Sequence, residues 1–115
     1  MSVYFLRRGE PPVLYVTVKV ASPGDATYCY AIINGTKRYS IGTFEVHVGD
    51  TITFGVYGYN TSTAGWVKID GTEVLRVTNS SLKTYDWTVP CGISTIEIRM
   101  SSQTHDYGRI TVTTA

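Results

Sequence analysis

The side chains with which this chain could perform catalysis are few. Its 115 residues include two histidines, two cysteines and nine acidic residues. A catalytic nucleophile needs a base within hydrogen-bond reach and a third group that orients the base. His47 alternates with apolar residues and is expected to face solvent beside Glu45, and His105 falls in a polar turn. Because the chain also lacks a Gly-x-Ser-x-Gly motif, the sequence predicts no catalytic residues and no enzyme.

The same side chains lack the spacing of a metal site. No pair of cysteines and histidines shows the short ligand spacing of zinc modules. Asp50, Asp70 and Asp106 each stand at an expected turn, where an aspartate that caps the turn needs no calcium. We therefore expect no metal and no cofactor. Cys29 and Cys91 are compatible with a disulfide between two sheets or with two separate thiols, and we favour the thiols.

An aromatic segment offers a different chemistry, that of ligand binding. Tyr57, Tyr59 and Trp66 surround Asn60 and a run of Thr and Ser residues. The C–H faces of a sugar pack on aromatic rings, while its hydroxyls bond to Asn, Thr and Ser; Tyr and Trp are also the preferred anchors of protein interfaces. In the alternative interpretation, Trp66 caps one end of the fold and the tyrosines cover its rim. The candidate ligand-binding residues are Tyr57, Tyr59, Asn60 and Trp66.

Two further groups of residues suggest contacts between subunits. Tyr28 and Tyr30 are expected on the outer side of a strand, where they suit a flat contact better than a pocket. Near the N-terminus, apolar residues precede a stretch rich in Arg, Gly and Pro, so they are expected to dock on a neighbouring subunit or to extend a sheet edge. The alternative is an ordinary first edge strand. These candidate interface residues are Tyr4, Phe5, Leu6, Tyr28 and Tyr30.

Strands must position all of these side chains, because the apolar residues recur with a period of two along almost the whole chain. Turn residues separate the runs, and hairpins are expected across Gly49-Asp50 and Gly71-Thr72. The sequence predicts a single all-β domain over residues 13–115, an antiparallel two-sheet sandwich of about eight or nine short strands, after an arm or edge strand over 1–12. A small closed barrel is the competing architecture. The expected extended segments cover residues 14–20, 27–33, 37–48 with an interruption at Gly42, 51–57, 66–70, 73–78 and 85–89, with two more around 96–100 and 110–112.

Several runs resemble bacterial and phage immunoglobulin-like domains. The run GTFEVHVGDTITF at 42–54 is similar to their hairpin, in which two apolar alternations meet at a Gly-Asp turn. VKIDGTEV at 67–74, YDWTVP at 85–90, IEI at 96–98 and GRITVT at 108–113 look like their later strands. Antibody-type domains fit less well, because Ile41 and Gly42 stand where a Trp would follow the first Cys, and Val89 stands where a Tyr would precede the second.

The resemblance implies an immunoglobulin-like sandwich that serves as a small bacteriophage structural protein. Such a protein is non-enzymatic, mediates protein–protein contacts in a head, tail or fibre of the virion, and is expected to form a homo-oligomer. The alternative is a carbohydrate-binding module for host or cell-surface glycans. The apolar stretch at 3–6 is too short for a signal peptide, so we expect synthesis in the cytoplasm followed by incorporation into a virion. The net charge of +1 and the absence of a long apolar run argue against nucleic-acid binding and membrane insertion.

Overall fold

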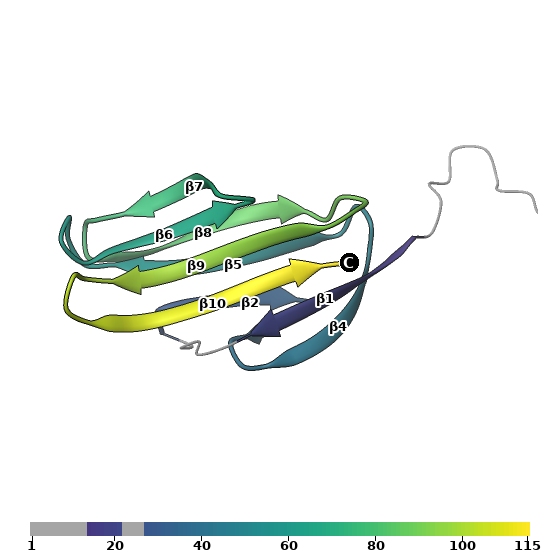
Figure 1. Cartoon of the computed structure of the whole chain (residues 1–115), viewed down its shortest axis with the longest axis horizontal. Helices are drawn as coiled ribbons and strands as arrows, with labels where there is room; N and C mark the ends of the chain where they lie inside the picture. The colour runs from purple at the N-terminus through teal and green to yellow at the C-terminus, as the bar shows by residue number, and fades with distance from the viewer. Residues whose placement is uncertain (1–13, 22–26) are drawn as a thin grey trace, which may run out of the picture.

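The alternating apolar residues form ten antiparallel strands in the part of the chain that the computed structural model describes, residues 14–21 and 27–115. The strands build two open sheets that stack face to face (Figure 1). This confirms the predicted sandwich over the closed barrel, with ten strands instead of eight or nine. The arm at 1–12 lies outside the described residues. The six-stranded sheet has the order β4 (Gly42–His47), β1 (Tyr15–Ala21), β10 (Asp106–Thr114), β9 (Ser94–Ser101), β6 (Ala64–Ile69) and β7 (Thr72–Val77); the four-stranded sheet has the order β3 (Thr36–Arg38), β2 (Cys29–Ile33), β5 (Thr51–Gly58) and β8 (Ser81–Thr88).

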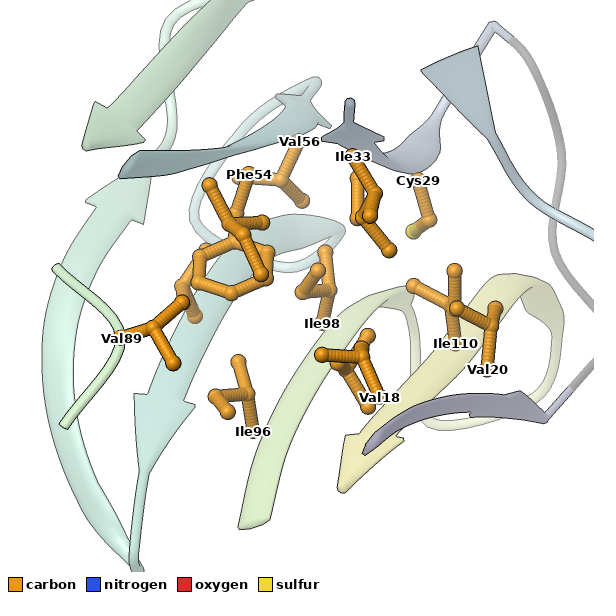
Figure 2. Packing of buried hydrophobic residues seen from close by; sticks show 14 of the residues in the cluster. Val18, Val20, Cys29, Ile33, Phe54, Val56, Val89, Ile96, Ile98 and Ile110 are labelled. Atoms are coloured by element: carbon orange, nitrogen blue, oxygen red, sulfur yellow. The ribbon is translucent and has the colours of Figure 1, made fainter. Parts of the chain in front are cut away.

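The core lies between the two sheets and consists of the apolar positions that alternate along each strand. Phe54, at the centre of β5, is fully buried, and its ring centroid lies 5.8 Å from that of Trp87 on β8. Figure 2 shows Phe54, Val56 and Ile33 of one sheet pointing toward side chains of the other sheet. The facing residues of the six-stranded sheet include Val18, Val20, Ile96, Ile98 and Ile110, each at most 2% exposed. Burial of this apolar area provides the main force that holds the sheets together.

The predicted hairpin across Gly49-Asp50 is wrong. β4 pairs with β1 in the six-stranded sheet, whereas β5 pairs with β2 and β8 in the other sheet. The turn between them is therefore an arch that carries the chain from one sheet to the other. The Oδ2 atom of Asp50 accepts a hydrogen bond from the backbone N–H of His47 at 2.9 Å, which closes this arch. Alternation fixes which face of a strand is buried, and both Val46 and Ile52 are buried here, but alternation does not fix the partner strand.

Tight turns close one end of the sandwich. β2 and β3 are joined by Asn34 and Gly35, and β6 and β7 by Asp70 and Gly71, the latter at the hairpin predicted across Gly71-Thr72. All four residues have positive φ, the conformation that a two-residue type I′ hairpin turn requires. The Oδ1 atom of Asp70 also accepts a hydrogen bond from the N–H of Thr95 at 2.8 Å. These turns fix the register of both hairpins.

The two cysteines lie apart and form no disulfide, as the sequence analysis favoured. Cys29 is buried on β2, and its Sγ atom lies 3.4 Å from the carbonyl oxygen of Gly108 on β10. Cys91 is exposed in the link between β8 and β9. The sheets are therefore joined in this region by packing and a thiol–carbonyl hydrogen bond.

Candidate functional site

The loop between β5 and β6 lies at the end of the sandwich opposite the tight turns, at the left in Figure 1. Asn60 shapes this loop, because its Oδ1 atom accepts hydrogen bonds from the backbone N–H groups of Ser62 and Thr63 at 3.0 and 2.8 Å. The N–H of Tyr59 donates to the carbonyl of Thr63 at 2.9 Å. The Tyr59 carbonyl in turn accepts from the backbone and hydroxyl of Ser80, each at 3.0 Å. Hydrogen bonds within the loop and from Ser80 thus hold the loop in place.

Two glycines set the direction in which this loop leaves the sheets. A Cβ atom on Gly58 would lie 1.8 Å from the carbonyl oxygen of Val77, and one on Gly65 would lie 2.1 Å from that of Tyr57. Any side chain at either position would therefore collide with backbone. The close approach of β5, β6 and β7 at this point requires glycine on both sides of the loop.

The first of two hollows beside this loop is lined mainly by tyrosines, and we call it the tyrosine hollow. It encloses about 540 Å³, within the range of pockets that hold small ligands. Segments that lie far apart in the sequence contribute to it. Its lining residues are Thr27, Tyr28, Tyr57, Tyr59, Asn60, Thr63, Met100 and Tyr107.

The tyrosines differ in how they are held. The rings of Tyr28 and Tyr57 meet edge to face with centroids 5.8 Å apart, and the N–H of Tyr57 donates to the Tyr28 carbonyl at 2.9 Å. Tyr59 and Tyr107 are 57% and 44% exposed, so both rings are accessible to a ligand. Met100, which is buried, lies among these residues. The hollow therefore combines a fixed aromatic pair with two accessible rings.

A bulge in β10 places Tyr107 at the hollow. Asp106 pairs with Ser101 and Gly108 pairs with the adjacent Met100, so Tyr107 is the extra residue between them. A bulge of this kind redirects a side chain out of the regular alternation. The ring of Tyr107 also stacks on that of His105, with centroids 5.9 Å apart and an interplanar angle of 27°. Tyr107 is a site residue that sequence reasoning missed, because period-two alternation gives no signal for a bulge.

The second hollow lies on the other side of the loop, and we call it the tryptophan hollow. It encloses about 650 Å³ on the outer face of the six-stranded sheet, where Trp66 alternates with the buried Val67. The Nζ atom of Lys68 lies 4.5 Å from the centroid of the Trp66 ring, at a distance typical of a cation–π contact. The lining residues are Thr61, Ser62, Ala64, Trp66, Arg76, Ser101, Ser102, Gln103 and Thr104.

Among the residues that the structure describes, Arg76 is the one charged side chain that lines the tryptophan hollow. It is held by Glu73, whose Oε1 atom accepts from Nη2 at 2.7 Å and from Nε at 3.1 Å. This hydrogen bond to Arg76 lowers the pKa of Glu73 below its ordinary value, and the same bond raises the pKa of Arg76. The ion pair therefore favours one orientation of the guanidinium beside the hollow.

The structure thus divides the residues predicted to bind a ligand. Tyr57, Tyr59 and Asn60 line one hollow, and Trp66 lines the other. Tyr28, predicted as an interface residue, joins the tyrosine hollow.

Tyr30, the other predicted interface residue that the structure describes, lines neither hollow. Tyr30 lies over Gly55 with the Nζ atom of Lys37 4.2 Å from its ring centroid, and only 5% of the residue is exposed. Its ring therefore offers little surface for a flat contact. Tyr4, Phe5 and Leu6 lie outside the described residues.

Both histidines are exposed, as the sequence predicted. His47 packs against Tyr15 with ring centroids 4.4 Å apart, and its Nδ1 atom lies 3.7 Å from Asp50. His105 stands in the turn between β9 and β10, with Nδ1 3.0 Å from the hydroxyl of Thr104. Within residues 14–21 and 27–115, no three His, Cys, Asp or Glu side chains gather in a group suited to a metal ion. The same ranges contain no helix that is long and apolar enough to span a membrane.

Comparison with known proteins found no relative of this chain. No protein-family model matches the chain, and no curated protein or solved structure matches it significantly.

Proposed function

We propose that this chain is a non-enzymatic carbohydrate-binding domain and that the tyrosine hollow is its binding site. The observation that carries the proposal is the convergence of Tyr28, Tyr57, Tyr59 and Tyr107 around one hollow of ligand size. They come from the turn before β2, from β5 and the loop after it, and from the bulge in β10.

The chemistry of the lining favours a neutral, polyhydroxylated ligand. Aromatic rings pack against the C–H faces of a sugar, and each phenol hydroxyl both donates and accepts a hydrogen bond. Thr27 and Thr63 add two more hydroxyls, and none of the lining residues within 14–21 and 27–115 is charged. A sugar can therefore be held without the cost of burying an unpaired charge.

We also propose that the sandwich is of the immunoglobulin-like class. The order β2-β5-β8 in one sheet corresponds to strands A, B and E of that fold. The order β7-β6-β9-β10 in the other sheet corresponds to the C′, C, F and G strands of the variable type. In this alignment β1, β3 and β4 are additions at the edge, and the two hollows lie among the loops at one end, where domains of this class commonly bind ligands.

A glycan array followed by titration calorimetry tests the carbohydrate proposal. Tyr59→Ala and Tyr107→Ala should each weaken binding of a neutral oligosaccharide by at least tenfold, about 1.4 kcal/mol. Tyr39→Ala is the matched control, because Tyr39 is similarly exposed at 41% but does not line either hollow. Binding that survives both hollow variants, or a chain that binds no glycan, would refute the proposal.

A virion assembly protein is the second candidate, and it is favoured by exposed apolar side chains outside the hollows. Leu14 and Tyr15 are 44% and 65% exposed at the start of β1, and Ile93 is 80% exposed in the link between β8 and β9. Apolar side chains at such positions are typical of contacts between subunits.

Light scattering on a sizing column tests the assembly role separately from the carbohydrate-binding role. We expect a defined oligomer that dissociates when residues 1–9 are removed or when Tyr15 is replaced by Ser. A monomer at high concentration in all three forms would refute the assembly role and leave the carbohydrate proposal standing.

A further inference from the structure

The tryptophan hollow differs in chemistry from the tyrosine hollow, although both lie beside the same loop. Its lining combines one aromatic ring, one cation and several side chains with hydroxyl or amide groups. Thr61 and Ser62 come from the loop after β5, whereas Ser102, Gln103 and Thr104 come from the turn between β9 and β10. Ala64, between these two segments, has a small side chain and leaves the space open.

We propose that the tryptophan hollow is a second sugar site, selective for a sugar that bears a carboxylate, such as a uronic acid. This inference rests on the proposed carbohydrate-binding function. It concerns residues that the tyrosine hollow does not share, so separate variants test the two sites.

Trp66 is positioned to serve as the stacking surface. Residues two apart on a strand share a face, so Ala64 and Lys68 flank Trp66 on the outer face of β6. The Lys68 ammonium lies over the ring, and Ala64 lies on the hollow side. A sugar ring that enters over Ala64 therefore meets the indole without displacing Lys68.

Arg76 is positioned to bind the carboxylate. A guanidinium has five N–H donors in a planar fork, and Glu73 accepts from the Nε group and from one N–H of Nη2. Within the described part of the chain, the two N–H groups of Nη1 and the second N–H of Nη2 have no acceptor, so these donors remain for a ligand. These donors match the two oxygens of a carboxylate, and charge-assisted hydrogen bonds of this kind are stronger than those to a neutral hydroxyl.

A further cation, besides Arg76 and Lys68, lies on the strand next to Trp66. Arg99 is the cross-strand partner of Trp66 on β9, and its Nη2 atom lies 3.6 Å from Asp106. Its Nε atom is buried and has no hydrogen-bond partner among the residues that the structure describes. Arg99 and Arg76 thus flank Trp66 on neighbouring strands, which favours an anionic group beside the indole.

The test uses trimers of galacturonic, glucuronic and mannuronic acid, each beside the same trimer with its carboxyl groups reduced to alcohols. Calorimetry should show at least tenfold tighter binding of one acidic trimer than of its reduced partner. The fluorescence of Trp66 should change during that titration, and Trp66→Phe should remove this change. Equal affinity for every acidic and reduced pair, or no binding of any acidic trimer, overturns the proposal.

Matched variants separate this site from the tyrosine hollow. Trp66→Ala should weaken binding of the acidic trimer by at least tenfold, and Arg76→Gln should bring the ratio between acidic and reduced trimers close to one. Tyr59→Ala should leave that ratio unchanged. If the preference for the acid persists in Arg76→Gln, the inference is wrong even when neutral sugars bind at the tyrosine hollow. If Tyr59→Ala abolishes neutral binding while Trp66→Ala has no effect, the proposed function stands without this second site.

Discussion

The ion pair between Glu73 and Arg76 makes a contribution to the stability of the fold that depends on pH. The hydrogen bond from Arg76 lowers the native pKa of Glu73 below its ordinary value of 4.5. A carboxyl with a lowered native pKa stabilises the fold above its unfolded pKa, and this contribution is lost as the pH falls through the native pKa. Because the pair lies on the surface, its contribution is small.

Glu73→Gln should therefore lower the free energy of unfolding slightly at pH 7. The difference from the unchanged protein should shrink as the pH falls below 4.5, the ordinary pKa of Glu73, because the unfolded chain then takes up protons first. Below the lowered native pKa the difference should vanish, since residue 73 is then neutral in both proteins. Urea denaturation at pH 7 and at pH 3 provides the measurement. Glu97→Gln is a suitable control, because Glu97 is also exposed on the six-stranded sheet. A destabilisation by Glu73→Gln that is the same at both pH values would contradict the argument.

At the scale of elements, the sequence predicts strands better than it predicts their partners. Nearly every alternating run became a strand, and both Asn34-Gly35 and Asp70-Gly71 form turns with positive φ. The arch at Asp50 was mistaken for a hairpin because the same alternation serves a strand in either sheet. Partner choice depends on how the whole core packs, and no local pattern encodes it.

The residues of the candidate site could likewise be predicted from the sequence only in part. Tyr57, Tyr59 and Asn60 were predicted together because they are close in the sequence, and they do share a hollow. Trp66 is almost as close, yet the turn of the chain after the loop places it on the outer face of the other sheet. Tyr107 could not be assigned to the site from the sequence, because its position depends on the bulge in β10. Proximity in sequence therefore identified the loop but not the side of the loop that each ring faces.

The crossing of β5 and β6 provides a prediction at this scale. Gly58→Ala should destabilise the protein by about 3 kcal/mol, because the new methyl group would lie 1.8 Å from the Val77 carbonyl oxygen and backbone must move. Gly42→Ala is the matched control, since the atoms nearest to its new methyl group belong to the ring of Phe44, a side chain that can shift, and not to backbone. Its cost should be about 1 kcal/mol or less. Chemical denaturation measures both, and similar costs for the two variants would contradict this account of the crossing.

At the scale of the whole molecule, the two cysteines report on whether the sheets separate. Cys91 is exposed and Cys29 is buried between the sheets. In the native protein a thiol reagent should modify one equivalent rapidly, and the second should react only as the sandwich opens. Cys91→Ser should remove the rapid phase and leave the slow one. Rapid reaction of both thiols in the native protein would show that the sandwich opens far more readily than this packing implies.

The two ends of the sandwich tolerate amino-acid substitutions to different degrees. At one end, two-residue turns with positive φ restrict the residues that fit, and Asp50 and Asp70 tie the chain with side-chain hydrogen bonds. At the other end, the path of the loop is set by Gly58 and Gly65, which lie outside the exposed residues 59–62. Substitutions at positions 59, 61 and 62 should leave the core and the register of the sheets untouched, as long as Asn60 is kept to hold the loop through Ser62 and Thr63. The protein is therefore suited to serve as a scaffold in which randomised loop residues are selected for new ligands while a single framework is kept.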